Sequence, residues 1–528
     1  MTNNICNNPI LPGFYPDPSL CRVGDDYYLV NSTFDYFPGV PIFHSKDLVN
    51  WKQIGNILDR EEQIPLGNDN FVGAGIYAPT LRYHDGVFYM ITTNIGSSNG
   101  NFIVTATDPA GPWSDPICLG SEGIDPSLFF DEDGKCYYHG TKGRREGTRF
   151  FGDNEIYVQE LDLETMTLVG ESWPIWHGAL RGVEWAEGPH IFKHDGWYYL
   201  MISEAGTGHM HAVTIARSKS LHEPFEGYNG NPILTHRHLG VNYPIVNVGH
   251  PDIVETQNGE WWMVLLASRP YGGYYRNLGR ETFLVKFEWE NGWPLINPGK
   301  GLVEDTFPRP NLPEYKVEEK PAKDDFDYTS LPYNYMYVRN PKQANYSLTD
   351  KPGYLRLTPS TVKISDKIGS PSAICTRQLH MSYSFETTLE ITPTANDAAG
   401  LVLLQGNYNN YQFCVTSDNN ETKVKVLVCD GKEETSIDRI LAEETLEYDN
   451  TKPLRITLRA VQKGQTADFS YSYDGSTYTE VLKGADTTIL CTDKAGGFVG
   501  TCLGIYAQSI SDSDNKVYFD SITYEGIE

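Results

Sequence analysis

Three acidic residues, Asp17, Asp125 and Glu187, lie far apart in this sequence but at corresponding places in a repeated phrase. Asp17 and Asp125 each precede Pro-Ser-Leu, and Glu187 precedes Gly-Pro-His-Ile. A pair of carboxyl groups can split an acetal, because one protonates the leaving oxygen while the other activates water. Gathering anions in a partly desolvated site adds no stability, since like charges oppose ionisation. If the fold brings these side chains together, chemistry is the better explanation.

The phrase that contains these acids occurs five times in the first 260 residues and predicts the elements that position them. Each copy joins a proline and a branched apolar residue to a tight turn and a pair of aromatic residues. The copies begin at Asp17, Ala78, Asp125, Gly188 and His250. Most of the turns contain Asp-Gly or Asn-Gly, which supply the positive φ angles of hairpin turns. Five hairpins spaced by about 50–60 residues predict a five-bladed β-propeller.

The innermost strand of each propeller blade lines the central channel, so the five starting positions are expected to meet near the axis. Glu187 is adjacent to one of them. An Asp before a proline is, taken singly, an ordinary turn or capping residue. The coincidence of three acids at or next to the same blade position favours a catalytic site at one mouth of the channel.

The surroundings of the three acids suggest different roles. Glu187 follows Trp185 and Ala186 and would face two anions, which keep a general acid protonated near neutral pH. Asp17 is the better candidate for the base, and Asp125 could position a sugar and hold the proton on Glu187. If Asp17 and Glu187 stand roughly 6.5–9.5 Å apart, a water fits between them and the anomeric centre inverts.

The composition narrows the class of protein. A chain of 528 residues predicts two or three domains. The net charge of −27 argues against nucleic acid and anionic membranes as partners, while 34 Tyr and 10 Trp suit β-rich folds and stacking on sugars. Nine scattered cysteines favour a reducing compartment. The N-terminus shows no signal peptide and no apolar stretch reaches the roughly 20 residues of a membrane span, so we expect a cytoplasmic protein.

The domain organisation follows from changes in pattern along the chain. The five hairpins assign residues 1–302 to the propeller, and four prolines with charged residues mark 303–324 as an extended linker. Alternating segments such as 386–391, 423–428 and 454–458 then have the period of two that is typical of strands. We therefore expect an all-β protein, a five-bladed β-propeller followed by a jelly-roll-like β-sandwich over residues 325–528.

Three segments carry a family resemblance: residues 14–19, 123–129 and 184–190. In order and spacing they resemble the signature segments of glycoside hydrolase family 43, and the similarity extends over essentially the whole chain. The resemblance implies an inverting exo-glycosidase that releases terminal β-D-xylose, α-L-arabinofuranose or both from (arabino)xylan-derived oligosaccharides. It also implies that Asp17 is the general base, Asp125 the residue that adjusts the pKa, and Glu187 the general acid.

The same resemblance implies further substrate-binding residues. Arg280 would hydrogen-bond the terminal sugar, although an ion pair with Glu281 is the alternative. Phe34 and Tyr77 would form aromatic walls, or else pack between blades. Phe498 would cap the site from the sandwich, unless it belongs to a buried strand. The family commonly has Trp-Ala-Pro-Asp where this chain has Tyr-Ala-Pro-Thr from Tyr77, which leaves the choice between xylose and arabinofuranose open.

His250, at the fifth axial position, is the remaining candidate for substrate binding. In the family the matching histidine lies beneath the active site, sometimes with a structural calcium or sodium ion in the channel. A core hydrogen bond is the alternative for a lone histidine. We expect no catalytic metal and no required cofactor.

Two other functions compete with hydrolysis of pentosides. A non-catalytic sugar-binding propeller would need aromatic platforms but no protonated acid. A sialidase-like hydrolase, suggested by the phrase from Ser45 to Trp51, would need several arginines around its acidic sugar. A related pentosidase or galactosidase of the same clan is a closer alternative. In each case the expected partner is an oligosaccharide, and a homo-oligomer is compatible with the sequence.

Overall fold

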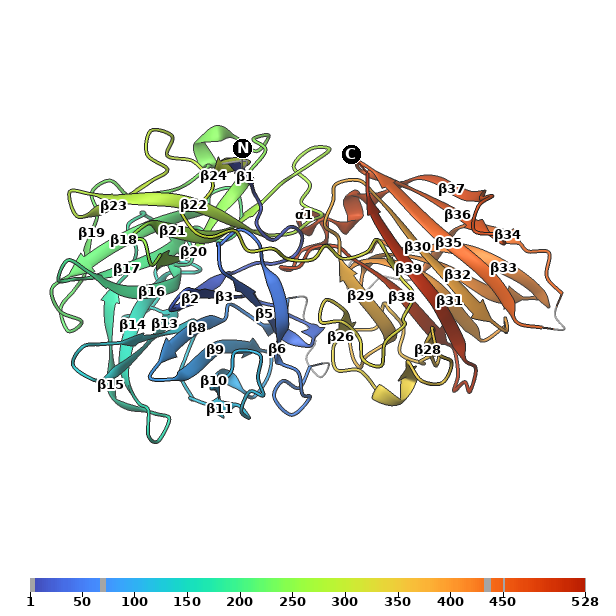
Figure 1. Cartoon of the computed structure of the whole chain (residues 1–528), viewed down its shortest axis with the longest axis horizontal. Helices are drawn as coiled ribbons and strands as arrows, with labels where there is room; N and C mark the ends of the chain where they lie inside the picture. Colours follow the sequence, from blue (N-terminus) through green and yellow to red (C-terminus); the bar gives the residue numbers. More distant parts are fainter. Residues whose placement is uncertain (1–4, 67–72, 432–437, 450–451, 528) are drawn as a thin grey trace.

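The protein has two β-rich parts that lie side by side (Figure 1). The structure is a computed structural model and describes residues 5–66, 73–431, 438–449 and 452–527. The propeller strands come first in the chain and the sandwich strands follow. No helix among the described residues has the length and apolar character needed to cross a bilayer.

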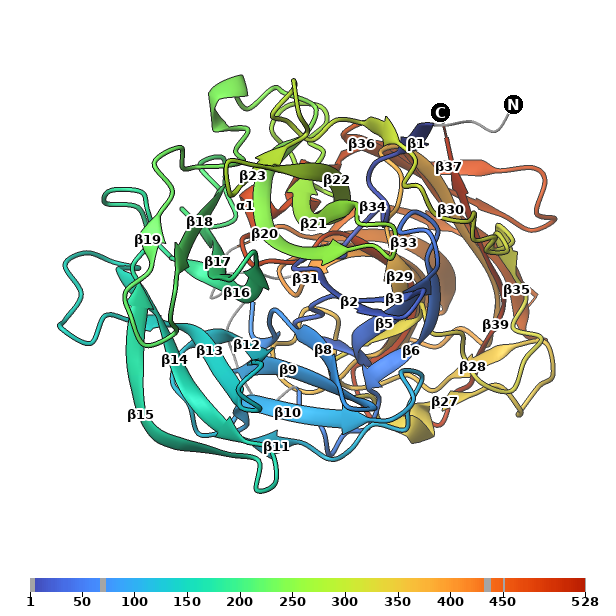
Figure 2. The same cartoon turned by 60° about the vertical axis from the view of Figure 1, so that its left-hand side comes forward.

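The propeller consists of five antiparallel sheets, each containing one of the predicted hairpins. In Figure 2 the first strands of these hairpins surround a common centre. The first sheet contains β2 (Ser19–Val23), β3 (Asp26–Val30), β5 (Gly39–Ser45) and β6 (Lys52–Leu58). The second contains β7 (Gly75–Ile76), β8 (Thr80–His84), β9 (Val87–Ile95), β10 (Gly100–Ala106) and β11 (Ile117–Cys118). The third contains β12 (Ile124–Phe130), β13 (Cys136–Gly143), β14 (Asn154–Asp162) and β15 (Thr167–Trp176). The fourth sheet contains β16 (Glu187–His194), β17 (Trp197–Glu204), β18 (Ala212–Ser218) and β19 (Glu226–Gly227). The fifth contains β20 (Val246–Glu255), β21 (Trp261–Ser268), β22 (Glu281–Glu290) and β23 (Trp293–Ile296).

Apolar residues between neighbouring blades hold the ring together. Each blade interface has its own buried cluster. The cluster that contains Leu20 and Tyr27 of the first blade also contains Trp262 and Val264 of the fifth, so burial of apolar surface closes the ring.

The sandwich consists of two eight-stranded sheets around one large apolar core. One sheet contains β25 (Lys323–Asp324), β27 (Tyr346–Ser347), β28 (Leu355–Leu357), β30 (Tyr383–Ile391), β35 (Leu454–Lys463), β36 (Thr466–Ser472), β37 (Thr479–Asp486) and β39 (Val517–Gly526). The other contains β26 (Met336–Val338), β29 (Ser372–Arg377), β31 (Asp397–Gly406), β32 (Asn409–Asp418), β33 (Glu421–Cys429), β34 (Arg439–Thr445), β38 (Cys502–Ser509) and the propeller segment β4 (Tyr36–Phe37). The alternating burial along β30 agrees with the period of two in its sequence.

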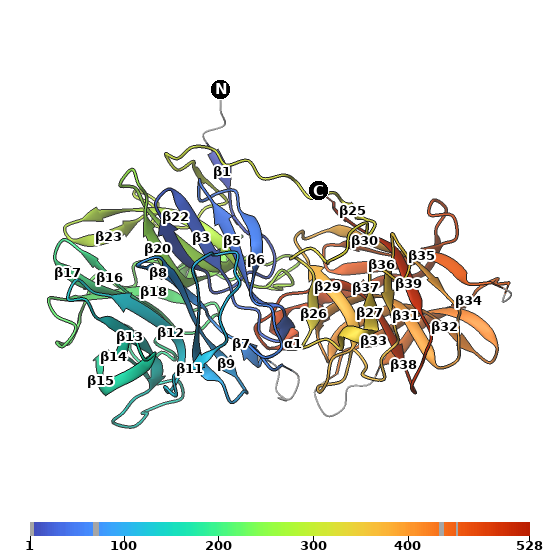
Figure 3. The same ribbon diagram turned by 60° about the horizontal axis from the view of Figure 1, so that its bottom comes forward.

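Two kinds of connection join the propeller to the sandwich. The segment after β23 forms β24 (Thr306–Pro308), which pairs with β1 (Ile5–Asn7), and then runs to β25 in the sandwich (Figure 3). In addition, β4 leaves the first blade and pairs with β26, so one sandwich sheet ends on a propeller strand. The helical elements among the described residues are short: η1 (Arg237–Leu239), η2 (Gln343–Asn345), η3 (Thr487–Leu490) and α1 (Thr492–Ala495).

Candidate active site

The backbone at the axial positions has an unusual conformation that repeats from blade to blade. Asp17, Asp125, Gly188 and His250 have φ angles of 52°, 51°, 58° and 50°. The strand pairing shifts register just after three of these positions, in β12, β16 and β20. Such bulges re-aim side chains, and left-handed φ costs about 1–2 kcal/mol per non-glycine residue. Backbone strain of this kind is typical of functional sites.

Asp17, Asp125 and His250, together with Glu187 next to Gly188, line one cavity of about 240 Å³ at the propeller axis. At about 30 Å³ per water, this volume equals about eight waters, enough for one sugar ring. All eight predicted site residues line it: Asp17, Phe34, Tyr77, Asp125, Glu187, His250, Arg280 and Phe498. The fold therefore brings together residues from all five blades and the sandwich.

Glu187 has the environment of a general acid. Burial raises its pKa well above the usual range, and the charges of Asp125 and Asp17 raise it further, while Arg280 opposes them. Burial also raises the pKa of Asp125, against the effect of His250 and of the hydrogen bond from the Gly188 N–H (3.0 Å). The site therefore favours a proton on Glu187 near neutral pH.

Asp17 is buried and both of its oxygens accept hydrogen bonds. Arg280 donates through Nη1 to Oδ1 at 2.7 Å, and the Ser32 hydroxyl donates to Oδ2. The alternative ion pair between Arg280 and Glu281 is wrong, because Glu281 accepts two hydrogen bonds of 2.7 Å from Arg269 instead. Arg280 is thus fixed at the cavity by Asp17.

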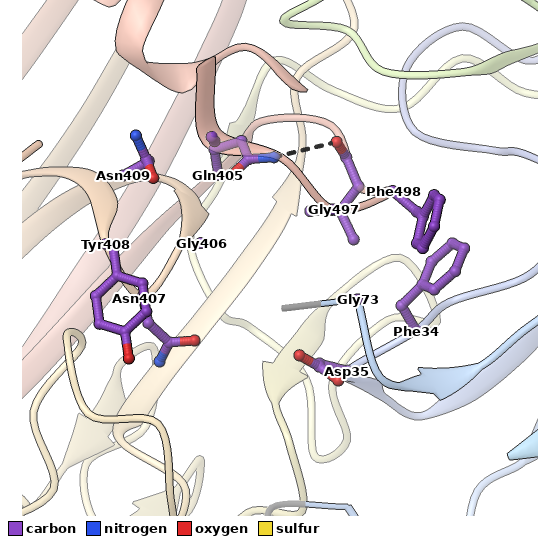
Figure 4. A pocket seen from close by; sticks show the side chains of 12 residues that line it. Phe34, Asp35, Gly73, Gln405, Gly406, Asn407, Tyr408, Asn409, Gly497 and Phe498 are labelled. Carbon is purple, nitrogen blue, oxygen red and sulfur yellow. Dashed lines mark hydrogen bonds between the residues drawn. The ribbon is translucent and has the colours of Figure 1, made fainter. Parts of the chain in front are cut away.

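Three aromatic rings form one wall of the cavity. Phe34 and Phe498 are stacked with centroids 5.5 Å apart, and Tyr77 meets both rings edge-on at 5.2 and 5.7 Å. Figure 4 shows the Phe34 and Phe498 rings side by side. The buried-strand alternative for Phe498 is wrong, because this residue lies in the connection between α1 and β38. The sandwich therefore supplies part of the wall.

Several hydrogen bonds fix the connection that carries Phe498. Gln405 on β31 donates to the carbonyls of Gly496 (3.2 Å) and Val499 (3.5 Å). From the propeller side, Arg280 donates through Nη2 to the Phe498 carbonyl at 3.2 Å. Both parts of the protein thus hold the Phe498 backbone in place.

His250 is buried against the backbone of Gly188, and its Nδ1 lies 3.9 Å from Asp17 Oδ1. Within the described ranges, no group of three or more His, Cys, Asp or Glu side chains is arranged to hold a metal ion. The calcium or sodium ion near His250 stays a prediction.

Comparison with known proteins identifies the family. The profile of glycosyl hydrolases family 43 matches residues 6–294, and that of the β-xylosidase C-terminal concanavalin A-like domain matches residues 323–525. The chain belongs to glycosyl hydrolase family 43. It is therefore a glycoside hydrolase, and its all-β propeller-and-sandwich fold agrees with the prediction from sequence.

Several relatives of this family 43 enzyme match it over nearly their whole length. A xylosidase/arabinosidase of Butyrivibrio fibrisolvens is 49% identical, with 99% of this chain and 100% of the relative covered. A non-reducing end α-L-arabinofuranosidase of Bacteroides ovatus is 38% identical, with 97% and 93% covered. The solved structure of a xylan β-1,4-xylosidase from Bacillus halodurans has a TM-score of 0.90 at 34% identity, with 98% and 100% covered.

Sequence reasoning missed other residues that line the cavity of this family 43 enzyme. The sequence indicates Trp185 only as a neighbour of Glu187, but it lines the cavity, and Gly206 lies so close that a Cβ there would be 2.6 Å from the Trp185 ring. Thr207 and Ile124 also line the cavity. The position of Trp185 beside Glu187 is a usable signal, whereas Gly206 and Thr207 follow β17 without any motif.

Proposed function

We propose that this enzyme is an inverting exo-glycosidase that removes terminal β-D-xylose, α-L-arabinofuranose or both from (arabino)xylan-derived oligosaccharides. The observation that carries the proposal is the single cavity in which Asp17, Asp125 and Glu187 face a wall completed by Phe498. A cavity for one sugar, closed by a residue from the second domain, suits removal of terminal units.

The proposed reaction uses two proton transfers. Glu187 donates its proton to the glycosidic oxygen as the bond from this oxygen to the anomeric carbon breaks. A water attacks the anomeric carbon from the opposite face and gives its proton to Asp17, so the configuration inverts. Asp125 holds the proton on Glu187 before the reaction, and Arg280 binds sugar hydroxyls beside Asp17. Atoms balance as one water consumed for each bond split.

The range of sugars rests on the relatives and on the chemistry of the cavity. The relatives are named for xylosidase, arabinosidase or arabinofuranosidase activity. β-D-Xylose and α-L-arabinofuranose present similar hydroxyl positions to one pocket, which supports a site that accepts both. A sialidase-like function is disfavoured, because Arg280 is the one arginine among the described residues that line the cavity.

The proposal is tested by incubating the purified enzyme with aryl β-D-xyloside and aryl α-L-arabinofuranoside and following the first-formed anomer by NMR. Inversion predicts α-xylose from the first substrate and β-arabinose from the second. A retained configuration would contradict the assigned mechanism. Binding of xylose without release of product from either substrate, or from xylo-oligosaccharides, would favour the sugar-binding alternative.

The roles of the acids are tested by two substitutions. Glu187→Ala and Asp17→Ala should each remove most activity on poor leaving groups. An activated leaving group such as dinitrophenol needs no protonation, so it should restore much of the rate of Glu187→Ala but not of Asp17→Ala. Restoration of Asp17→Ala alone would show that the roles are reversed.

A further inference from the structure

A second ring of buried polar side chains lies directly below the axial positions. The residue after each repeated proline belongs to it, and we call these residues the second layer: Ser19, Thr80, Ser127, His190 and Asp252. Ser19 Oγ donates to Asp252 Oδ2 at 2.7 Å, and Ser127 Oγ lies 3.1 Å from His190 Nδ1. These contacts join residues of the first and fifth blades and of the third and fourth.

The guanidinium of Arg82, from β8 of the second blade, connects the members of this layer. Its Nη1 donates to Asp252 Oδ2 at 2.8 Å and to Ser19 Oγ at 3.3 Å. Its Nη2 lies 2.9 Å from His190 Nδ1. Burial lowers the pKa of His190 to about 3, so this ring is neutral and its Nδ1 can accept the hydrogen bond.

Asp252 is the anion that the guanidinium neutralises. Burial opposes its ionisation, but the charge of Arg82 and the hydrogen bond that Arg82 donates lower the pKa of Asp252 to about 2. Backbone N–H groups of Leu20 (3.0 Å) and Ile253 (2.9 Å) also donate to its carboxylate. One planar guanidinium therefore bridges three blades from a fourth, which a lysine ammonium could not do with the same geometry.

The second layer is connected to the catalytic acids by very short pieces of backbone. Ser19 lies two residues after Asp17, and His190 lies three residues after Glu187. Asp252 lies two residues after His250. Any displacement of the second layer must therefore move the carboxyl groups above it.

We propose that Arg82 is a positioning residue, the fixed cation of the propeller axis, whose guanidinium sets the separation of Asp17, Asp125 and Glu187 by holding the strands that carry them. The proposal rests on the function proposed above for these acids. It also gives a side chain the structural role at the axis that a calcium or sodium ion sometimes has in the family. The alternative is that Arg82 only neutralises Asp252 and contributes to stability.

The test removes the charges of Arg82 and Asp252 together. Removal of a second ion pair, which lies elsewhere between two blades, is the control. Arg82→Met/Asp252→Asn keeps the net charge, so a change in the titration of Glu187 reports altered distances. The control is Lys193→Met/Asp131→Asn, because Lys193 and the buried carboxylate of Asp131 form a 2.6 Å ion pair between the fourth and third blades.

Three quantities are measured for both double variants: the thermal midpoint, kcat on whichever aryl glycoside the wild type splits faster, and the titration of Glu187 by carbon-13 NMR, assigned with Glu187→Gln. Both variants should lose thermal stability. Only the axis variant should lose about tenfold or more in kcat, because misplacement by about 1 Å can cost a hundredfold. In that variant the pKa of Glu187 should fall as Asp17 and Asp125 move away.

An axis variant that behaves like the control in both kcat and the Glu187 titration would overturn the proposal. If the axis variant does not fold, Arg82→Lys is measured in the same way, and unchanged values of both quantities overturn the proposal equally. The titration needs no turnover, so the proposal is still tested if the proposed glycosidase activity fails. The wild type is also measured with added calcium and with a chelator. If calcium raises its thermal midpoint and kcat and the chelator lowers them again, the assignment of the axial charge to Arg82 is refuted.

Discussion

Phe498 offers a sharp test of whether the sandwich takes part in catalysis. Its ring stacks on Phe34, meets Tyr77 edge-on and lies 5.7 Å from the Arg280 guanidinium. Its backbone is held separately, by Gln405 through neighbouring carbonyls and by Arg280 directly. Phe498→Ala should therefore remove the ring without releasing the connection that carries it.

The expected magnitude follows from the interactions that the ring makes. Two aromatic pairs contribute about 0.5–1.5 kcal/mol each and a cation–π contact about 0.5–1 kcal/mol, or about 1.5–4 kcal/mol together. Phe498 also lines the sugar cavity. If about 1.4 kcal/mol of this stabilisation is also lost in the transition state, kcat/KM falls about tenfold. The thermal midpoint should fall by several degrees.

The assay compares kcat/KM on an aryl pentoside and thermal unfolding for Phe498→Ala and for a control, Phe130→Ala. Phe130 is similarly half-buried and packs against the rings of His84 and Tyr89 at 4.3 and 5.3 Å, away from the cavity. Both variants should unfold at lower temperature, but only Phe498→Ala should lose activity. Equal kcat/KM in the two variants would show that Phe498 has only a packing role.

Two further predictions concern the third and fourth blades. Glu187 acts while protonated, so activity is lost as pH rises through its pKa. The charge of Asp125 raises that pKa, and Asp125→Asn should therefore move the basic limb of the kcat/KM profile to lower pH. A basic limb that stays in place or moves to higher pH would contradict this coupling. Gly188→Ala places a Cβ 2.9 Å from the His250 ring, on a backbone with a φ of 58°. Steady-state kinetics should therefore show a lower kcat with little change in KM. A variant with the kcat of the wild type would show that this close approach is unimportant.

The parts of the fold and the site that the sequence predicts are those encoded locally. The turns at Asp85-Gly86 and Asp195-Gly196 have the positive φ angles that their residues favour, and they fix the hairpins and hence the axial order. Once five hairpins form a ring, Asp17 and Asp125 must meet near its centre. No contact between distant residues has to be known for that step.

The parts that could not be predicted depend on contacts across blades or domains. Arg82 is an ordinary polar residue of a strand in sequence, and its partners lie in three other blades. Tyr36 and Phe37 follow the first hairpin, yet they pair with a sandwich strand. The left-handed conformation of Asp125 opposes its intrinsic preference, so tertiary structure must impose it.

The pairing of β4 with β26 has a consequence for how such enzymes can be rebuilt. This strand starts two residues after Phe34, so an aromatic wall of the sugar cavity and the edge of the neighbouring sheet share one short stretch of chain. Exchanging the sandwich for another module would leave that edge without hydrogen-bonding partners and remove Phe498 at the same time. The propeller and the sandwich thus both contribute to the active site. New substrate specificities are therefore better sought by substitutions in the cavity than by exchanging domains.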